Sequence, residues 1–163
     1  MSLSKSKTGA LMVFERKNML DDAIKTGTAL DCTVNAELLK NIFWNKAPLH
    51  DGAVIVRAGR IVGAGCMLPM SGNVNLSREL GMRHRAGIGA SEHTDAVVAI
   101  VSEETGSISV AVGGMLKRHL APETLDRLLR NELKTDEDDG EKKSDLFPLV
   151  AALFNRGKKE GTE

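Results

Sequence analysis

Aromatic side chains are scarce in this chain of 163 residues: they make up 3% of it, with one Trp and no Tyr. The length predicts one domain with a single core, which must therefore rest on Leu, Ile, Val, Ala and Met. Basic and acidic residues number 22 each, so neither nucleic acid nor an anionic membrane is expected to bind through broad electrostatic attraction. If phosphates are bound, the positive charge that binds them must be local.

Cysteines and long apolar runs are also rare. Cys32 and Cys66 form no metal-ligand pattern and are typical of small buried apolar side chains in a reducing compartment. No run approaches the roughly 18 apolar residues of a membrane-spanning helix, and no signal peptide is recognisable. We therefore expect a soluble fragment whose residues 1–8 are a disordered start or a cloning remnant.

Apolar patterning predicts a mixture of strands and helices. Two of the predicted strands form a hairpin around Ala58-Gly59. Helices are predicted after Asn35, which suits an N-cap, and from Pro122, which suits a first helical position; a weaker one covers 83–90. The expected fold is α/β of the mixed α+β kind, with a central mixed sheet flanked by helices. The predicted strands are residues 8–15, 53–57, 60–67, 95–102 and 108–112.

The end of the chain changes character. Residues 135–144 are almost wholly polar and charged, which predicts a flexible linker. Residues 146–154 are apolar and could dock on the body as a strand or helix, or be a partner site that is loose in isolation. Residues 134–163 are therefore interpreted as a polar linker and C-terminal tail.

His50-Asp51-Gly52-Ala53, directly before a predicted strand, is the first of three segments that could do chemistry. Asp and His at a strand mouth can bind a divalent metal or transfer a proton. Gly52 would let a ligand approach the backbone. Taken alone, the segment is more often a simple turn before a strand.

Arg83-His84-Arg85 is the second segment. Guanidinium groups match phosphate oxygens, but residues two apart on a helix point to different sides. Both arginines can therefore reach one ligand only at a helix start or on a loop. A solvated face with surface ion pairs is the alternative.

Ser102-Glu103-Glu104 follows a predicted strand and is the third segment. Its carboxylates could hold a metal and Ser102 could bind a phosphate, although a hairpin turn with exposed acids is the commoner arrangement. Met67 and Leu68 begin an apolar patch that is either core or a slot for adenine.

Together these segments resemble the diadenylate cyclase (DAC) family. Its two signatures, Asp-Gly-Ala and Arg-His-Arg, stand here as Asp51-Gly52-Ala53 and Arg83-His84-Arg85. The likeness defines residues 9–133 as a catalytic domain with the DAC-domain fold. It is strongest to the membrane-tethered type, which implies a place at the cytoplasmic side of the membrane through N-terminal helices outside this sequence.

The resemblance implies that two ATP molecules are joined into cyclic di-AMP with release of two pyrophosphates. It implies a divalent metal, Mn²⁺, Mg²⁺ or Co²⁺, on His50, Asp51 and Glu104. The implied catalytic residues are Asp51, Gly52, Ala53 and Glu104. The implied phosphate-binding residues are Arg83, His84, Arg85, Ser102 and Glu103, and adenine is expected at Met67 and Leu68.

A symmetric product from two ATP molecules also implies a face-to-face dimer, since one domain carries one set of motifs. A regulatory protein partner is a further expectation. The sequence departs from many relatives at Met82, where they carry Thr, and from some at Met67, where they carry Tyr. Two other classes stay open: a sensor that binds adenine nucleotides without chemistry, and a metal-dependent phosphohydrolase.

Overall fold

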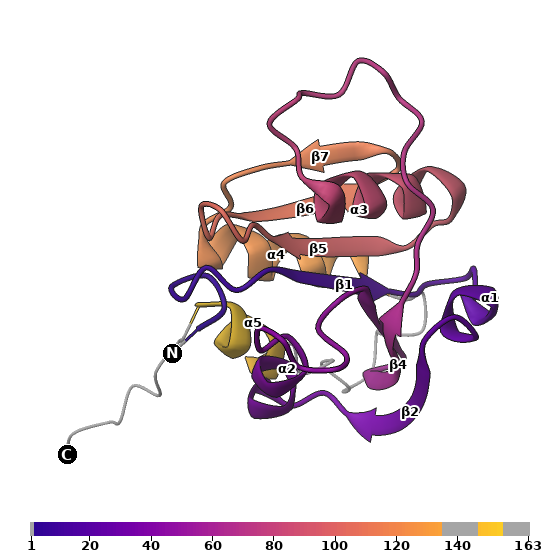
Figure 1. Cartoon of the computed structure of the whole chain (residues 1–163), viewed down its shortest axis with the longest axis vertical. Helices are drawn as coiled ribbons and strands as arrows, with labels where there is room; N and C mark the ends of the chain where they lie inside the picture. Colours follow the sequence, from indigo (N-terminus) through magenta and orange to yellow (C-terminus); the bar gives the residue numbers. More distant parts are fainter. Residues whose placement is uncertain (1, 135–146, 155–163) are drawn as a thin grey trace.

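The computed structural model describes residues 2–134 and 147–154. Within residues 2–134, seven strands form one sheet in the order β2-β4-β3-β1-β5-β6-β7 (Figure 1). β1 pairs with β3 in parallel and with β5 antiparallel, so the predicted mixed sheet is confirmed. The strands are β1 (Ala10–Phe14), β2 (Thr28–Thr33), β3 (Ala53–Arg57), β4 (Arg60–Cys66), β5 (Val97–Val101), β6 (Ile108–Val112) and β7 (Met115–Lys117).

Helices cover both faces of the sheet, as continuous apolar strands such as β1 and β5 require. Met12 and Phe14 of β1 face a core shared with α2, α4 and α5, whereas Leu11 and Val13 face a core shared with α1 and α3 (Figure 1). The central sheet flanked by helices is thus as expected. The helices are α1 (Asp21–Ile24), α2 (Ala36–Ile42), α3 (Met82–His93), α4 (Pro122–Glu132) and α5 (Phe147–Phe154).

The helix starts agree with their sequence signals. The Asn35 side chain accepts hydrogen bonds from the backbone N–H groups of Glu37 and Leu38, at 2.8 and 3.2 Å, and Pro122 opens α4. The third helix is longer than the predicted 83–90. Its glycines serve close packing: a Cβ at Gly89 would overlap the carbonyl oxygen of Pro69, so the segment after β4 crosses directly over α3.

Three elements were not predicted: α1, β2 and β7. α1 and β7 are short, with four and three residues. β2 and β7 lie at the edges of the sheet, where mostly exposed side chains leave a weak apolar pattern. Cys32, on β2, is consequently only partly buried, in contrast to the expectation. Cys66 is fully buried, and burial raises the pKa of its thiol, which keeps it unreactive.

The two ends of the described chain pack together. The expected disordered start does not hold for residues 2–8, because Leu3 is buried and its N–H donates to the carbonyl of Ala152, at 3.0 Å. The apolar tail forms α5, which packs on α2 and α4. The predicted linker at 135–144 lies outside the described residues. Of the helices described, none is long and apolar enough to cross a membrane.

Candidate active site

The predicted site residues come from segments that meet at one edge of the sheet. β5 ends beside the start of β1, with Val101 opposite Ala10, and β4 ends beside the start of β3. A cavity of about 940 Å³ opens there. Its walls are residues 6–9, 50–52, 66–70, 81–86 and 101–104, although not every residue of each range faces the cavity.

Asp51 stands at the centre of this arrangement. Its Oδ1 lies 3.4 Å from His50 Nε2 and 3.9 Å from Arg83 Nη2, and its side chain is 83% exposed. The Nδ1 atom of His50 lies 2.7 Å from the carbonyl oxygen of Ala47. If Nδ1 carries the proton of a neutral imidazole, Nε2 keeps a free lone pair beside the carboxylate.

Gly52 is required by the backbone. Its φ is +100°, and a Cβ would lie 2.7 Å from the carbonyl carbon of Gly65. Any larger residue would therefore push β3 and β4 apart at the point where Asp51 enters the cavity. Ala53, predicted as catalytic, is fully buried in β3 and does not line the cavity.

Arg83 joins two acidic segments. Its Nη1 donates to Glu103 at 2.8 Å, while its Nη2 faces Asp51. Its Nε is buried and has no hydrogen-bond partner among the described residues. A buried unpaired donor is costly, so this N–H is available to an anionic ligand in the cavity.

His84 lines the same cavity and is only 6% exposed. Burial lowers its pKa, the positive charge of Arg118 lowers it further, and Glu104 opposes both. The imidazole is therefore neutral near pH 7 and can contribute to phosphate binding only as a neutral hydrogen-bonding group. Its Nε2 is buried and unpaired in the described part of the chain, which leaves a hydrogen-bonding atom for a ligand.

The structure separates the two arginines of Arg83-His84-Arg85. Arg85 donates from Nε to the carbonyl of Leu80, at 3.3 Å, and from Nη2 to the carbonyl of Ser77, at 3.2 Å. It does not line the cavity. The residues lie at the start of α3, yet the helical turn still directs positions two apart to different sides, so the helix start does not bring both arginines to one ligand. Arg85 instead supports the loop before the helix.

Ser102 organises the turn after β5. Its Oγ accepts hydrogen bonds from the N–H groups of Glu104 and Thr105, both at 3.2 Å. Its own hydroxyl hydrogen remains available to a ligand. Glu103 and Glu104 both line the cavity, and only Glu103 pairs with Arg83.

An apolar wall faces these polar groups. Met67 is 65% exposed and its N–H donates to the Thr26 hydroxyl, at 2.8 Å. Leu68 is buried, and its backbone forms no hydrogen bond to the residues described. Met70 and Met82 add two further exposed thioethers. This wall has the composition of a slot for a flat base.

The predicted metal set is only partly assembled. His50 and Asp51 are adjacent, but no three His, Cys, Asp or Glu side chains are close enough to hold a metal ion in the part of the chain that the structure describes. Glu104 is thus not gathered with the other two. The donors present nevertheless fit a cation such as Mg²⁺, which commonly takes one or two carboxylates and completes its shell with substrate phosphates and water.

Sequence reasoning missed the part of the wall that comes from the start of the chain. Ser6, Lys7, Thr8 and Gly9 line the cavity, as do Phe43, Asn45 and Glu79. A Lys immediately before the Thr-Gly that leads into a buried strand was the available signal. It was overlooked because residues 1–8 were interpreted as disordered.

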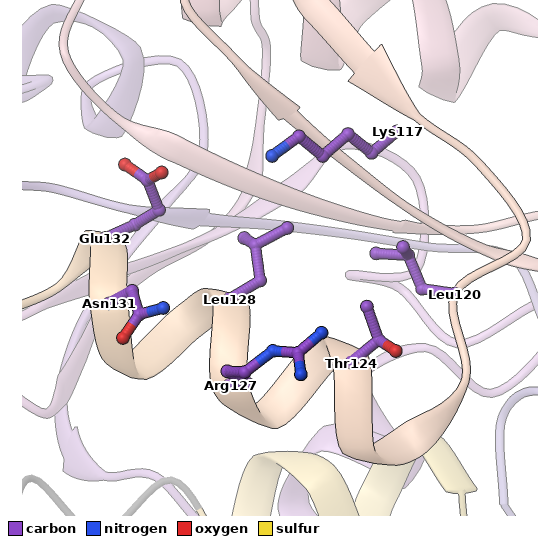
Figure 2. Close-up of a pocket in the computed structure, with 7 residues that line it drawn as sticks. All are labelled: Lys117, Leu120, Thr124, Arg127, Leu128, Asn131 and Glu132. Atoms are coloured by element: carbon purple, nitrogen blue, oxygen red, sulfur yellow. The ribbon is translucent and has the colours of Figure 1, made fainter.

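A second, smaller cavity of about 210 Å³ lies between β7 and α4 (Figure 2). Lys117 extends across it from the strand, and Arg127, Asn131 and Glu132 border it from the helix. None of the predicted site residues lines it.

The chain is similar to several known proteins over most of its length. The family model described as "DisA bacterial checkpoint controller nucleotide-binding" (DAC) matches residues 1–116. The cyclic di-AMP synthase CdaA of Bacillus subtilis is 47% identical over 137 residues, 84% of this chain and 50% of that protein. A diadenylate cyclase of Listeria monocytogenes is 46% identical over 133 residues, 82% of this chain and 49% of that protein. The chain thus spans about half the length of these relatives.

A crystal structure of a double mutant of DacA from Staphylococcus aureus is similar over most of this chain. It has a TM-score of 0.80 and 44% sequence identity, and the match covers 82% of this chain and 89% of that one. A hypothetical membrane-spanning protein from Bacillus cereus matches with a TM-score of 0.70 and 47% identity, over 73% of this chain and 58% of that one.

Proposed function

This chain belongs to the DAC family, and from that premise we propose that it joins two ATP molecules into cyclic di-AMP and releases two pyrophosphates. The observation that carries the proposal is the meeting of Asp51 and Arg83. They come from the two family signatures, lie 32 positions apart in the sequence, and place Oδ1 and Nη2 3.9 Å apart in one cavity. An acid and a phosphate-binding cation therefore face the same ligand.

The 3′ hydroxyl of each ATP attacks the α-phosphorus of the other. A bond forms between O3′ and that phosphorus, the bond to the bridging oxygen breaks, and pyrophosphate leaves with the electron pair. Asp51, exposed in the cavity, accepts the hydroxyl proton. Arg83 and neutral His84, which donates from Nε2–H, hold the phosphate oxygens, whose charge is the main electrostatic demand of such a transition state.

The same cavity also has room and suitable side chains for the adenine base and for a divalent metal ion. Adenine lies against Met67 and bonds the free backbone groups of Leu68. His50 Nε2 and Asp51 are the side chains that would hold a divalent cation, with phosphates and water completing its shell. When bound, the cation neutralises phosphate charge. Nitrogen and carboxylate donors accept Mn²⁺, Mg²⁺ or Co²⁺.

Catalysis requires two copies of the chain, because the reaction uses two ATP molecules and each chain contributes one such cavity among its described residues. Exposed apolar side chains at the cavity, Met67, Met70 and Met82, support a face that is covered by a second copy. In dilute solution the rate should therefore rise with the square of the chain concentration. A strictly linear dependence down to the lowest dilution would contradict the dimer.

The membrane location and a regulatory partner are supported by the resemblance to the membrane-tethered type alone. Cell fractionation of the whole protein tests the first. Co-purification with the Asp51→Asn variant, expressed in cells beside the parent protein, tests the second without adding cyclase activity.

The primary experiment incubates the chain with ATP and Mn²⁺ and separates the products by chromatography with mass detection. We expect cyclic di-AMP and pyrophosphate, and a loss of at least about 100-fold in Asp51→Asn, the scale of a lost general base. Asp31→Asn is the matched control, because Asp31 is an exposed acid on β2 whose ion-pair partner among the described residues is Arg60. Inorganic phosphate as the product would favour a phosphohydrolase, and ATP binding by a dimer that makes no product would favour a sensor.

A further inference from the structure

The first residues of the described chain form a turn that reaches the active-site cavity. Ser6, Lys7 and Thr8 line the cavity, whereas Lys5 does not. The N–H of Lys7 donates to the carbonyl of Ser4, at 3.2 Å, and that of Thr8 to the carbonyl of Leu3, at 2.9 Å. Lys7 has a φ of +50°, which a non-glycine residue adopts only where its surroundings hold it.

This turn packs against the turn after β5, which carries Glu103 and Glu104. Ser4 Oγ donates to the carbonyl of Gly106, at 2.7 Å. A Cβ at Gly106 would overlap the Ser4 carbonyl oxygen and would lie 3.4 Å from Lys7 Cγ. The stem of Lys7 thus lies beside Gly106, which fixes its position relative to Ser102, Glu103 and Glu104.

Arg83 and Lys7 differ in whether their positive charge is already paired with an acid. Arg83 is shared between Asp51 and Glu103, so its charge is already partly offset. Lys7 forms no ion pair with the described residues. It is therefore the cation that can meet a further negative charge without breaking an existing contact.

We propose that Lys7 binds the pyrophosphate part of ATP, and so stabilises the leaving group of the proposed reaction. This inference rests on the proposed function. Arg83 lies beside Asp51 and accounts for the α-phosphate, where the hydroxyl attacks. The β- and γ-phosphates carry most of the remaining charge, and a lysine ammonium is a common phosphate ligand. Charge that builds up on the bridging oxygen as the bond breaks is stabilised by a cation held in place beforehand.

The test compares Lys7→Met with Lys5→Met, which removes the same charge from the same turn outside the cavity. Affinities for pyrophosphate, ATP and AMP are measured by titration calorimetry with Mg²⁺ present. We expect Lys7→Met to weaken the binding of pyrophosphate and of ATP at least about tenfold, the scale of a lost charged hydrogen bond. AMP should bind as it does to the parent chain, and Lys7→Arg should restore most of the affinity.

Two results would overturn the proposal: unchanged pyrophosphate affinity in Lys7→Met, or an equal loss in Lys5→Met, which would mark a general effect of charge. Thermal unfolding of each variant identifies any loss that comes from misfolding. Because binding is measured without turnover, this outcome is separable from that of the proposed function. If the parent chain makes no cyclic di-AMP but Lys7→Met still weakens pyrophosphate binding, the cyclase proposal is refuted and the Lys7 proposal is not.

Discussion

Gly9 leaves the space that the guanidinium group of Arg83 fills: a Cβ at residue 9 would lie 2.6 Å from both Cζ and Nη1 of that side chain. Because Gly9 has no Cβ, the Arg83 side chain from the start of α3 packs directly against the backbone just before β1. From this position Arg83 reaches Asp51 and Glu103.

Gly9→Ala should therefore displace Arg83 without unfolding the protein. The atoms in conflict are the far end of a flexible side chain, so the cost in stability is small, but the guanidinium loses its position. We expect cyclase activity to fall by about tenfold or more, since each 1.4 kcal/mol of lost transition-state stabilisation is a factor of ten. Gly72→Ala is the control, because a Cβ there meets nothing within 4 Å. Full activity in Gly9→Ala would show that the position of Arg83 is unimportant.

The neutral state of His84 predicts a pH dependence of stability. Its pKa in the folded protein is lowered by burial and by Arg118, whereas in the unfolded chain it returns to about 6.5. Below that pH the unfolded chain binds the proton more readily, so the stability present above pH 6.5 is lost as the pH falls toward the lowered value. Urea unfolding should show that the unfolding free energy falls less between pH 7 and pH 5 in His84→Gln than in the parent. His119→Asn, at an exposed position, should behave as the parent does.

Much of the fold could be predicted because the central strands carry continuous apolar runs and two helices carry clear start signals. The edge strands β2 and β7 could not, since most of their side chains are exposed and neither strand carries a continuous apolar run. In the site, Asp51 and Arg83 were predicted through the two signatures, and Glu104 through the acidic segment that follows a predicted strand. The different directions of Arg83 and Arg85 depend on where α3 begins, which Gly81 and Met82 do not mark clearly.

The contribution of the chain start was missed for a different physical reason. Residues 2–8 are held by contacts distant in sequence, with Ala152, Leu153 and Gly106. Taken locally, they are a short polar segment without a period, which is indistinguishable from a disordered end. Lys7 becomes a candidate only when these distant partners are seen.

A buried acid outside the site gives a stability prediction. The Glu15 side chain is 2% exposed and accepts hydrogen bonds from Arg57, at 3.1 Å to Nη2, and from the N–H of Leu20, at 2.8 Å. Hydrogen bonds to Glu15 and then to Asp21 raise the pKa of Arg57. Arg57→Met should cost about 3 kcal/mol of unfolding free energy, the lower end for breaking a buried pair, because Arg57 is partly exposed. Arg60→Met, which breaks an exposed pair with Asp31, should cost less than about 1 kcal/mol, and equal losses would contradict the difference in burial.

Leu153 tests whether α5 is part of the domain. Its side chain is fully buried in the core that also holds Leu39 of α2 and Leu125 of α4, and its carbonyl accepts the N–H of Ser4, at 3.1 Å. Leu153→Ala should lower the unfolding free energy by about 2–5 kcal/mol, measured in urea, because it leaves a cavity in a packed core. Val74→Ala, at a residue that is 92% exposed, should leave it unchanged.

The same helix should matter for the active site, because it holds the backbone of Leu3 and Ser4, from which the turn with Lys7 begins. A chain ending at Lys134 lacks those acceptors, and we expect its pyrophosphate affinity to fall toward that of Lys7→Met while its AMP affinity stays closer to the parent's. Both affinities are measured at a temperature where the shortened chain remains folded by circular dichroism. An unchanged unfolding midpoint in the shortened chain would mean that α5 adds no stability, and parallel losses of AMP and pyrophosphate would mean that it supports the whole cavity and not the turn in particular.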